Sequence, residues 1–177
     1  MLRGIITLMV VFVAATAMVT VPADDQIDET NTVALVKANF LYQFASNINW
    51  PEQNRKGKFT IGVYGNNTLF EEMAAKYGAK PVGNQVIEVV NLRDFNASRY
   101  VHILYVDKSK KADIQRIVKE LKSESTLIVS SFDGGLTAGA DINFRTVDSS
   151  IRYELNKSAM DAKKMTAGVK ILQWAIK

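Results

Sequence analysis

The chain has 177 residues, of which 47% are apolar and 23% charged, and this composition is typical of a globular protein. Its 22 basic and 18 acidic residues are interspersed, which argues against a nucleic-acid-binding protein, because such proteins gather basic residues on one face. The absence of cysteine excludes disulfide bonds, thiol catalysis and cysteine-ligated metal sites.

The first 23 residues have the pattern of a secretory signal peptide. Arg3 provides a short positive region, an apolar run extends from Ile5 to Val21, and Val21-Pro22-Ala23 precedes two aspartates. We expect cleavage after Ala23, which leaves residues 24–177 as one exported domain. An uncleaved membrane anchor is the alternative, since the apolar run is close to the shortest that spans a bilayer.

An amphipathic helix is predicted from about residue 31 to residue 50. Asn31 or Thr32 could cap its start, and Pro51 requires it to end by Trp50. We expect Trp50 to close the edge of the core. The apolar residues at helical spacing are Val33, Leu35, Val36, Phe40, Leu41, Phe44 and Ile48.

A strand–helix unit follows. Phe59–Tyr64 predicts a strand, residues 68–77 a helix, and Gly78 its C-cap. Two further strands are expected at Gln85–Val90 and Arg99–Val106, the second buried on both faces as central parallel strands are.

The second half of the chain continues the alternation of helices and strands. Lys110–Lys122 predicts an amphipathic helix and Thr126–Ser130 a fourth parallel strand. Asp141–Arg145 and Ser150–Leu155 alternate around a turn and predict an antiparallel hairpin. A last helix is expected to start at a Ser158 cap and to run through Ala162, Val169, Leu172 and Ile176.

This order predicts a single α/β domain whose mixed sheet is parallel at its centre and antiparallel at the C-terminal hairpin, with helices on both faces. Three loops follow parallel strands: residues 65–67, residues 107–109 and the glycine-rich residues 130–139. Because such sheets bind ligands at the carboxyl ends of their strands, we expect a cleft near Ser130, Ser131 and Asp133.

No catalytic constellation is recognisable in the sequence, and neither a metal nor a cofactor is predicted. His102 is the only histidine, and its place on an apolar strand favours a neutral, structurally bonded side chain. Ser130 and Ser131 lack the G-x-S-x-G setting of a hydrolase nucleophile, so an exported hydrolase is disfavoured.

Several segments resemble, in order, the YfiR-like periplasmic regulator family of the DUF4154 type. They are Ala34–Phe44 followed by Trp50-Pro51, then Phe59–Gly65, Val101–Val106, and Asp141–Phe144 leading to Ile151–Asn156. The resemblance covers about residue 33 to the end of the chain. Gly62 and Val101 depart from it, because the family often has cysteine at these positions, and thiol-based redox control is therefore lost.

This resemblance implies a non-enzymatic periplasmic protein that restrains an inner-membrane diguanylate cyclase by binding its periplasmic part. Release of the restraint raises cyclic di-GMP and favours biofilm. The resemblance also implies a homodimer; no nucleic-acid partner and no membrane insertion after signal cleavage are expected. Gly139-Ala140-Asp141 replaces the Gly-Gly that usually precedes the Ile-Asn-Phe run, and Gly134-Gly135 are additional.

The partner-binding residues are predicted on exposed positions of the glycine loop and the hairpin: Phe132, Asp133, Arg145, Arg152 and Glu154. An alternative for Arg152 and Glu154 is a cross-strand or solvated charge on the outer face of the hairpin. A second hypothesis for the whole protein is a periplasmic small-ligand binder with a pocket formed by Trp50, Tyr64, His102 and Ser130.

Overall fold

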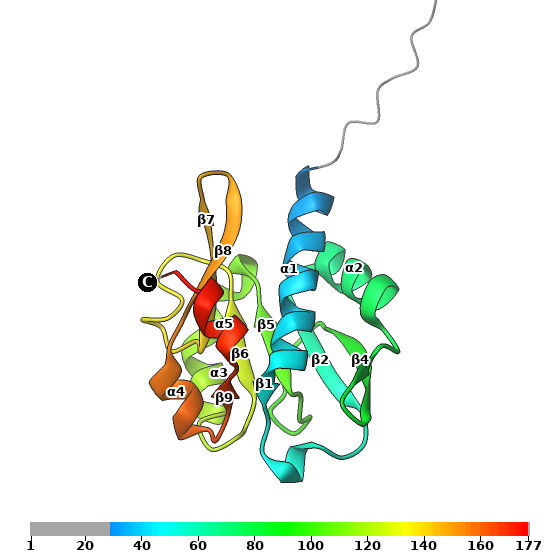
Figure 1. The fold of residues 1–177 in the computed structure, drawn as a ribbon. Helices are drawn as coiled ribbons and strands as arrows, with labels where there is room; N and C mark the ends of the chain where they lie inside the picture. Colours follow the sequence, from blue (N-terminus) through cyan, green and yellow to red (C-terminus); the bar gives the residue numbers. More distant parts are fainter. Residues whose placement is uncertain (1–28, 177) are drawn as a thin grey trace, which may run out of the picture.

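The central sheet has seven strands in the order β3-β4-β2-β5-β6-β7-β8, and a separate two-stranded sheet pairs β1 with β9 (Figure 1). The computed structural model describes residues 29–176. The expected signal peptide and its cleavage site lie outside these residues. Within them, no helix is long and apolar enough to cross a membrane.

The strands are β1 (Ile48–Asn49), β2 (Phe59–Tyr64), β3 (Pro81–Val82), β4 (Gln85–Leu92), β5 (Ile103–Val106), β6 (Leu127–Ser130), β7 (Ile142–Val147), β8 (Ser150–Leu155) and β9 (Thr166–Ala167). The helices are α1 (Glu29–Asn47), α2 (Asn67–Tyr77), α3 (Ile114–Glu120), α4 (Lys157–Ala162) and α5 (Val169–Trp174), with short 3₁₀ helices η1 (Glu52–Asn54) and η2 (Lys108–Asp113).

The sheet is parallel from β4 to β7 and antiparallel at both ends, where β3 pairs with β4 and β8 with β7. This confirms the predicted mixed α/β sheet with an antiparallel C-terminal hairpin. Strand β4 lies on one side of β2 and β5 on the other, so the chain changes direction between β2 and β5. Such a switch point separates the loops that follow the two strands and leaves a crevice between them.

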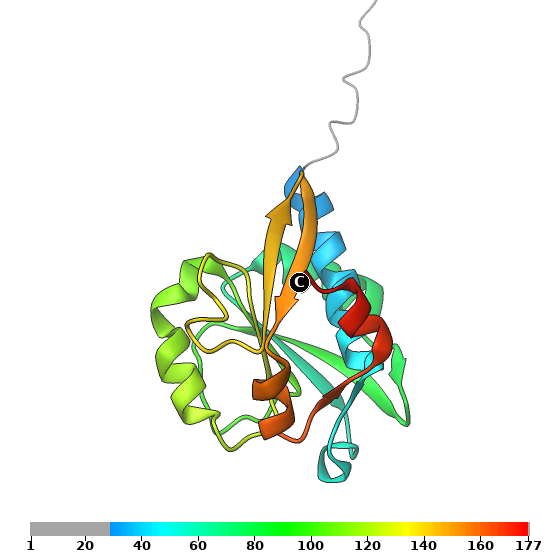
Figure 2. The same cartoon turned by 60° about the vertical axis from the view of Figure 1, so that its left-hand side comes forward.

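Helices cover both faces of the sheet, and Figure 2 shows α3 on the opposite side from α1 and α5. Alternate residues of each strand reach the two layers, because successive side chains of a strand point to opposite faces. In β5, Ile103 and Tyr105 join the core under α1, whereas Leu104 and Val106 join the core under α3.

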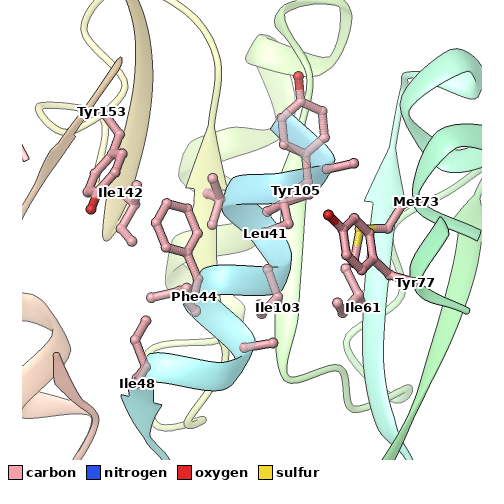
Figure 3. Close-up of a cluster of buried hydrophobic side chains, with 14 of the residues drawn as sticks. Leu41, Phe44, Ile48, Ile61, Met73, Tyr77, Ile103, Tyr105, Ile142 and Tyr153 are labelled. Atoms are coloured by element: carbon pink, nitrogen blue, oxygen red, sulfur yellow. The ribbon is translucent and has the colours of Figure 1, made fainter. Parts of the chain in front are cut away.

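Helix α1 provides the centre of the larger core. In Figure 3, Leu41 and Phe44 project from one face of α1 toward the sheet, with Tyr153 on one side and Met73 on the other. The rings of Phe44 and Tyr153 meet edge to face, with centroids 5.0 Å apart. Such contacts between distant segments bury enough apolar area to fix the position of α1 on the sheet.

Three predicted element boundaries are wrong. The helix expected at Lys110–Lys122 is shorter, because Lys108–Asp113 forms the 3₁₀ helix η2 and α3 begins only at Ile114. Helix α1 already includes Glu29, so Asn31 and Thr32 lie inside it and are not its N-cap. Strand β5 begins at Ile103 and not at Arg99, because the ladder with β2 starts there and the Arg99 amide bonds to Asn96 within a turn. The other predicted strands occur within a few residues of their expected limits.

The prediction of a single last helix is also wrong. Helix α4 is capped by Asn156, whose side chain accepts from the Ala159 amide, and Ser158 lies inside it. The chain leaves α4 through Lys164, which has a φ of 60°, and then forms β9. Gly168 donates its amide to the Asn47 carbonyl and starts α5, so pairing with the end of α1 replaces a continuous helix.

Candidate functional site

A cleft of about 490 Å³ opens at the carboxyl ends of the parallel strands. One wall is the N-terminal half of α1, and the opposite wall is the β7–β8 hairpin, which rises beside that half of the helix (Figures 1 and 2). The lining residues are Glu29, Thr30, Val33, Ala34, Lys37, Asn66, Asp107, Lys108, Ser131, Phe144, Arg145, Thr146 and Ile151.

The floor of this cleft comes from three adjacent strands. Tyr64 of β2 is in register with Val106 of β5, and Val106 with Ser130 of β6, so the three strands end at one level. The next residues to face the cleft are Asn66, Asp107 and Ser131. The expected cleft beside these loops therefore exists, but of Ser130, Ser131 and Asp133 only Ser131 lines it.

Lys37 of α1 is the buried cation of the cleft, with a residue exposure of 9%. Its ammonium donates to the Ser131 hydroxyl at 2.7 Å and to the Tyr105 hydroxyl at 3.3 Å. It also lies 5.7 Å from the centre of the Tyr105 ring and 6.0 Å from that of Phe144. Within residues 29–176, no carboxylate forms a direct ion pair with Lys37.

Asp107 is the buried anion behind Lys37. One of its oxygens accepts from Tyr105 and from Asn66, each at 3.1 Å, and the other accepts from the Ser109 amide at 3.0 Å. The Tyr105 hydroxyl thus accepts from Lys37 and donates to Asp107. Asn66 also caps α2 by accepting from the Leu69 amide, so the network is built on helix and strand ends.

The pKa shifts of Lys37 and Asp107 show that their charges are stabilised to different extents. Burial lowers the pKa of Lys37, and the positive charge of Lys108 adds to this effect while Asp107 opposes it. Burial alone would raise the pKa of Asp107, but its hydrogen bonds from Ser109, Asn66 and Tyr105 outweigh burial and lower the pKa. The ammonium is thus the group whose charge is incompletely compensated.

The predicted partner-binding residues of the hairpin lie on the face opposite to α1. Glu154 accepts from the Asn143 side chain at 2.9 Å and from Arg145 at 3.4 Å, while Asp133 is 4.0 Å from Arg145. Arg152 is in register with Arg145 across the hairpin and forms no ion pair within the described part of the chain. Three of these charges therefore form a cross-strand cluster, and Arg152 is exposed beside it.

The exposure expected for Phe132 is wrong. Its side chain packs in the core under α3, at 9% exposure, with the Lys111 ammonium 5.6 Å from the centre of its ring. Asp133, the next residue, is exposed, with a side-chain exposure of 99%. The glycine loop thus presents its carboxylate to solvent and its aromatic ring to the core.

The pocket predicted for a small ligand is not assembled. Trp50 and His102 contact each other, with ring centroids 5.8 Å apart, before the start of β5. Tyr64 and Ser130 both lie at the carboxyl ends of their strands, far from Trp50 and His102. They face the α3 side, where Tyr64 donates to Asp113 and Ser130 donates to Asn143. Trp50 is buried in the core, as expected, and borders a separate pocket of about 260 Å³.

His102 uses both ring nitrogens within the fold. Nδ1 accepts from the Thr60 amide at 3.1 Å, which leaves Nε2 to donate to the Asn54 carbonyl at 2.6 Å. Burial lowers its pKa, and the hydrogen bond to Asn54 opposes this only in part. The expected neutral, structurally bonded histidine is confirmed.

An exposed apolar surface that the sequence did not predict lies on α5 and the residues after it. We call it the α5 patch; its members and their exposures are Val169 at 69%, Leu172 at 37%, Trp174 at 50% and Ile176 at 40%. It adjoins the edge strand β8, because the Tyr153 hydroxyl donates to the Ile171 carbonyl and the Tyr153 backbone carbonyl accepts from the Ile176 amide.

Sequence reasoning also missed Lys37, although a signal was present. Lys37 is four residues from Val33 and from Leu41, so it falls on the apolar stripe of α1. A lysine within such a stripe is buried unless its side chain reaches a polar partner or solvent.

Among residues 29–176, no cluster of three or more His, Asp or Glu side chains could hold a metal ion.

Comparison with known protein families gives one match over most of the chain. A family model described as DUF4154, YfiR/HmsC-like, matches residues 34–176. A comparison with curated proteins gave no match. The matched region begins in α1 and includes most of the cleft, the hairpin and the α5 patch.

Proposed function

This chain belongs to the YfiR/HmsC-like family, and we propose from this membership that it is a periplasmic regulator which binds and restrains an inner-membrane signalling enzyme. The regulated enzyme is of the diguanylate cyclase type, and the contact is made with its periplasmic part. In this proposal the chain is exported by its N-terminal segment and processed after Ala23. It acts as a homodimer and carries out no chemical reaction.

The α5 patch is the single observation that best supports a binding role. Four large apolar side chains within eight residues are exposed, and exposed apolar surface of this kind commonly marks a protein interaction site. Trp174 is half exposed although tryptophan is among the residue types that contribute most to interface energies. Nothing else within the described residues exposes a tryptophan, because Trp50 is buried.

Charged residues on the other face of the edge strand β8 would form a rim of this interface where the partner reaches around the edge of the sheet. Arg152 is exposed and opposes Arg145, and two like charges in register repel each other in the free protein. An acidic surface on the partner would relieve that repulsion. We propose that Asp133, Arg145, Arg152 and Glu154 contribute to this rim, and that Phe132 acts from the core by positioning Asp133.

Restraint follows from preferential binding to one state of the enzyme. A regulator shifts a two-state equilibrium only to the extent that it binds one state more tightly, and moving it from 1:99 to 99:1 needs a preference of about 10⁴. An interface with a buried apolar centre and a charged rim can provide such a difference if only the inactive state presents the complementary surface.

The test is affinity capture from gently crosslinked cell envelopes, with residues 24–177 carrying a C-terminal tag. The variant Leu172→Asp/Trp174→Asp places charges in the α5 patch, and Val86→Glu is the matched control, because Val86 is exposed on the distant strand β4. We expect the unmodified chain and the control to recover an inner-membrane cyclase and the double variant to lose it. Equal recovery by all three chains, or recovery of no membrane protein, would contradict the proposal.

A further inference from the structure

The Lys37 ammonium has unused binding capacity at the floor of the cleft. A lysine ammonium has three N–H donors, and two are used by the hydroxyls of Ser131 and Tyr105. Both acceptors are neutral, and Lys37 makes no third hydrogen bond within residues 29–176. A buried cation is costly unless an anion compensates it.

The anion nearest to Lys37 cannot provide that compensation directly. Asp107 is separated from Lys37 by the Tyr105 hydroxyl, and its two oxygens already accept three hydrogen bonds. Lys108 adds positive charge around the cleft, and Glu29 is the only other carboxylate of its lining. The cleft therefore favours an anionic ligand over a cationic one.

The position of the cleft in the fold matches the general rule for ligand sites. Asn66 follows β2 and Asp107 follows β5, so the floor lies at the point where the strand order changes direction. Open α/β sheets bind ligands at this point, outside the carboxyl ends of the strands. A volume of about 490 Å³ is within the range for small organic ligands.

The side chains on the walls of the cleft indicate which chemical groups the rest of the ligand would carry. Phe144 and Ile151 line it from the hairpin, and Val33 lines it from α1. The Phe144 ring lies 6.0 Å from the Lys37 ammonium, so an apolar surface adjoins the cation directly. A ligand that pairs with Lys37 would place its remaining atoms against these side chains.

We propose that this cleft binds a small organic acid, with the carboxylate on Lys37 and an apolar body against Phe144, Ile151 and Val33. The carboxylate takes the third N–H bond of Lys37. This site differs from the α5 patch and from the pocket expected around Trp50 and His102. It does not depend on the regulatory role, because it requires only the side chains of the cleft.

The test is titration of isotope-labelled residues 24–177 with phenylacetate and hexanoate, followed by amide NMR. The neutral amides phenylacetamide and hexanamide are the matched ligands. We expect the acids to shift the amides of Lys37, Asn66 and Ser131 and to bind at least about tenfold more tightly than the neutral amides, as a charge-assisted hydrogen bond allows.

Two variants test whether the Lys37 ammonium binds the carboxylate of the ligand. Lys37→Met removes the ammonium and is expected to weaken acid binding about tenfold or more while leaving the binding of the neutral amides unchanged. Val33→Glu adds a carboxylate at an exposed position of the cleft, so it should weaken acid binding even if Lys37→Met does not fold. Acid binding that neither variant weakens, equal affinity for acids and amides, or no shift at the cleft in the millimolar range would overturn the proposal.

Discussion

Lys163 and Asp141 form the most deeply buried ion pair of the described residues, with the ammonium 2.7 Å from one carboxylate oxygen. The Asp141 side chain is fully buried and that of Lys163 is 10% exposed. The same carboxylate oxygen accepts from the Ile128 amide at 2.7 Å. This pair ties the turn after α4 to the start of β7, close to the glycine loop.

Removing the cation should destabilise the fold in a pH-dependent way. Burial raises the pKa of Asp141 although Lys163 and the Ile128 amide oppose it. Lys163→Met should raise that pKa further and cost about 3–5 kcal/mol of unfolding free energy at neutral pH, because a buried carboxylate loses its partner. The loss should shrink as the pH falls and Asp141 takes up a proton.

Urea unfolding of the native chain and Lys163→Met at neutral and acidic pH measures this effect. The double variant Lys163→Met/Asp141→Asn is the control, since a neutral amide can still accept from Ile128. It should recover part of the lost stability at neutral pH. A loss that is the same at both pH values would contradict the role of the buried charge.

His102 should make the folded state sensitive to mild acid. Its folded pKa lies below the ordinary value of 6.5, because burial disfavours the charged ring. As the pH falls, the unfolded chain therefore takes up the proton before the folded chain does. The free energy of unfolding is highest above about pH 6.5 and decreases as the pH falls toward the folded pKa. His102→Phe should be less stable at neutral pH but show a flatter pH profile. Unfolding curves at several pH values provide the comparison, and parallel profiles would refute the prediction.

Gly135 should tolerate no side chain. A Cβ at this position would collide with the Ser130 hydroxyl and with the Asn143 side-chain oxygen, so Gly135→Ala should cost about 1–3 kcal/mol through local displacement. Gly134→Ala is the control: it meets no atom within 4 Å and experiences only the strain of a φ of 80°. The side-chain amide signal of Asn143 should shift in the first variant and not in the second.

The hairpin turn offers a stabilising substitution. Asp148 and Ser149 have φ values of 46° and 59°, as in a type I′ turn, which favours Asn-Gly. Asp148→Asn/Ser149→Gly should stabilise the protein by about 1 kcal/mol, since left-handed backbone is unfavourable for most residues. Ser150→Gly, within β8, should destabilise it. Thermal unfolding of the two variants tests the difference in sign.

The sheet could be predicted because its strands carry their own signals. Phe59–Tyr64 is flanked by a charged loop and a glycine, and Ser150–Leu155 alternates after a turn, so local pattern and tertiary pairing agree. The C-terminal region could not be predicted in the same way. Its apolar spacing fits one helix, but pairing of β9 with β1 breaks that helix and exposes Val169 and Leu172.

The candidate sites depended on contacts between distant residues. Lys37 and Ser131 are 94 positions apart, and their proximity follows only from the packing of α1 across the sheet. Phe132 and Asp133 are neighbours, yet one packs under α3 and the other faces solvent. The sequence identified the glycine loop as important but not the direction of its side chains.

The proposed restraint of a signalling enzyme acts through the α5 patch. Its most direct test is the cyclic di-GMP content of cells that lack the protein and carry either the native chain or Leu172→Asp/Trp174→Asp, both exported to equal levels. We expect deletion to raise cyclic di-GMP, the native chain to restore it, and the double variant to leave it high. Cyclic di-GMP that does not respond to deletion, or full restoration by a folded double variant, would contradict the claim.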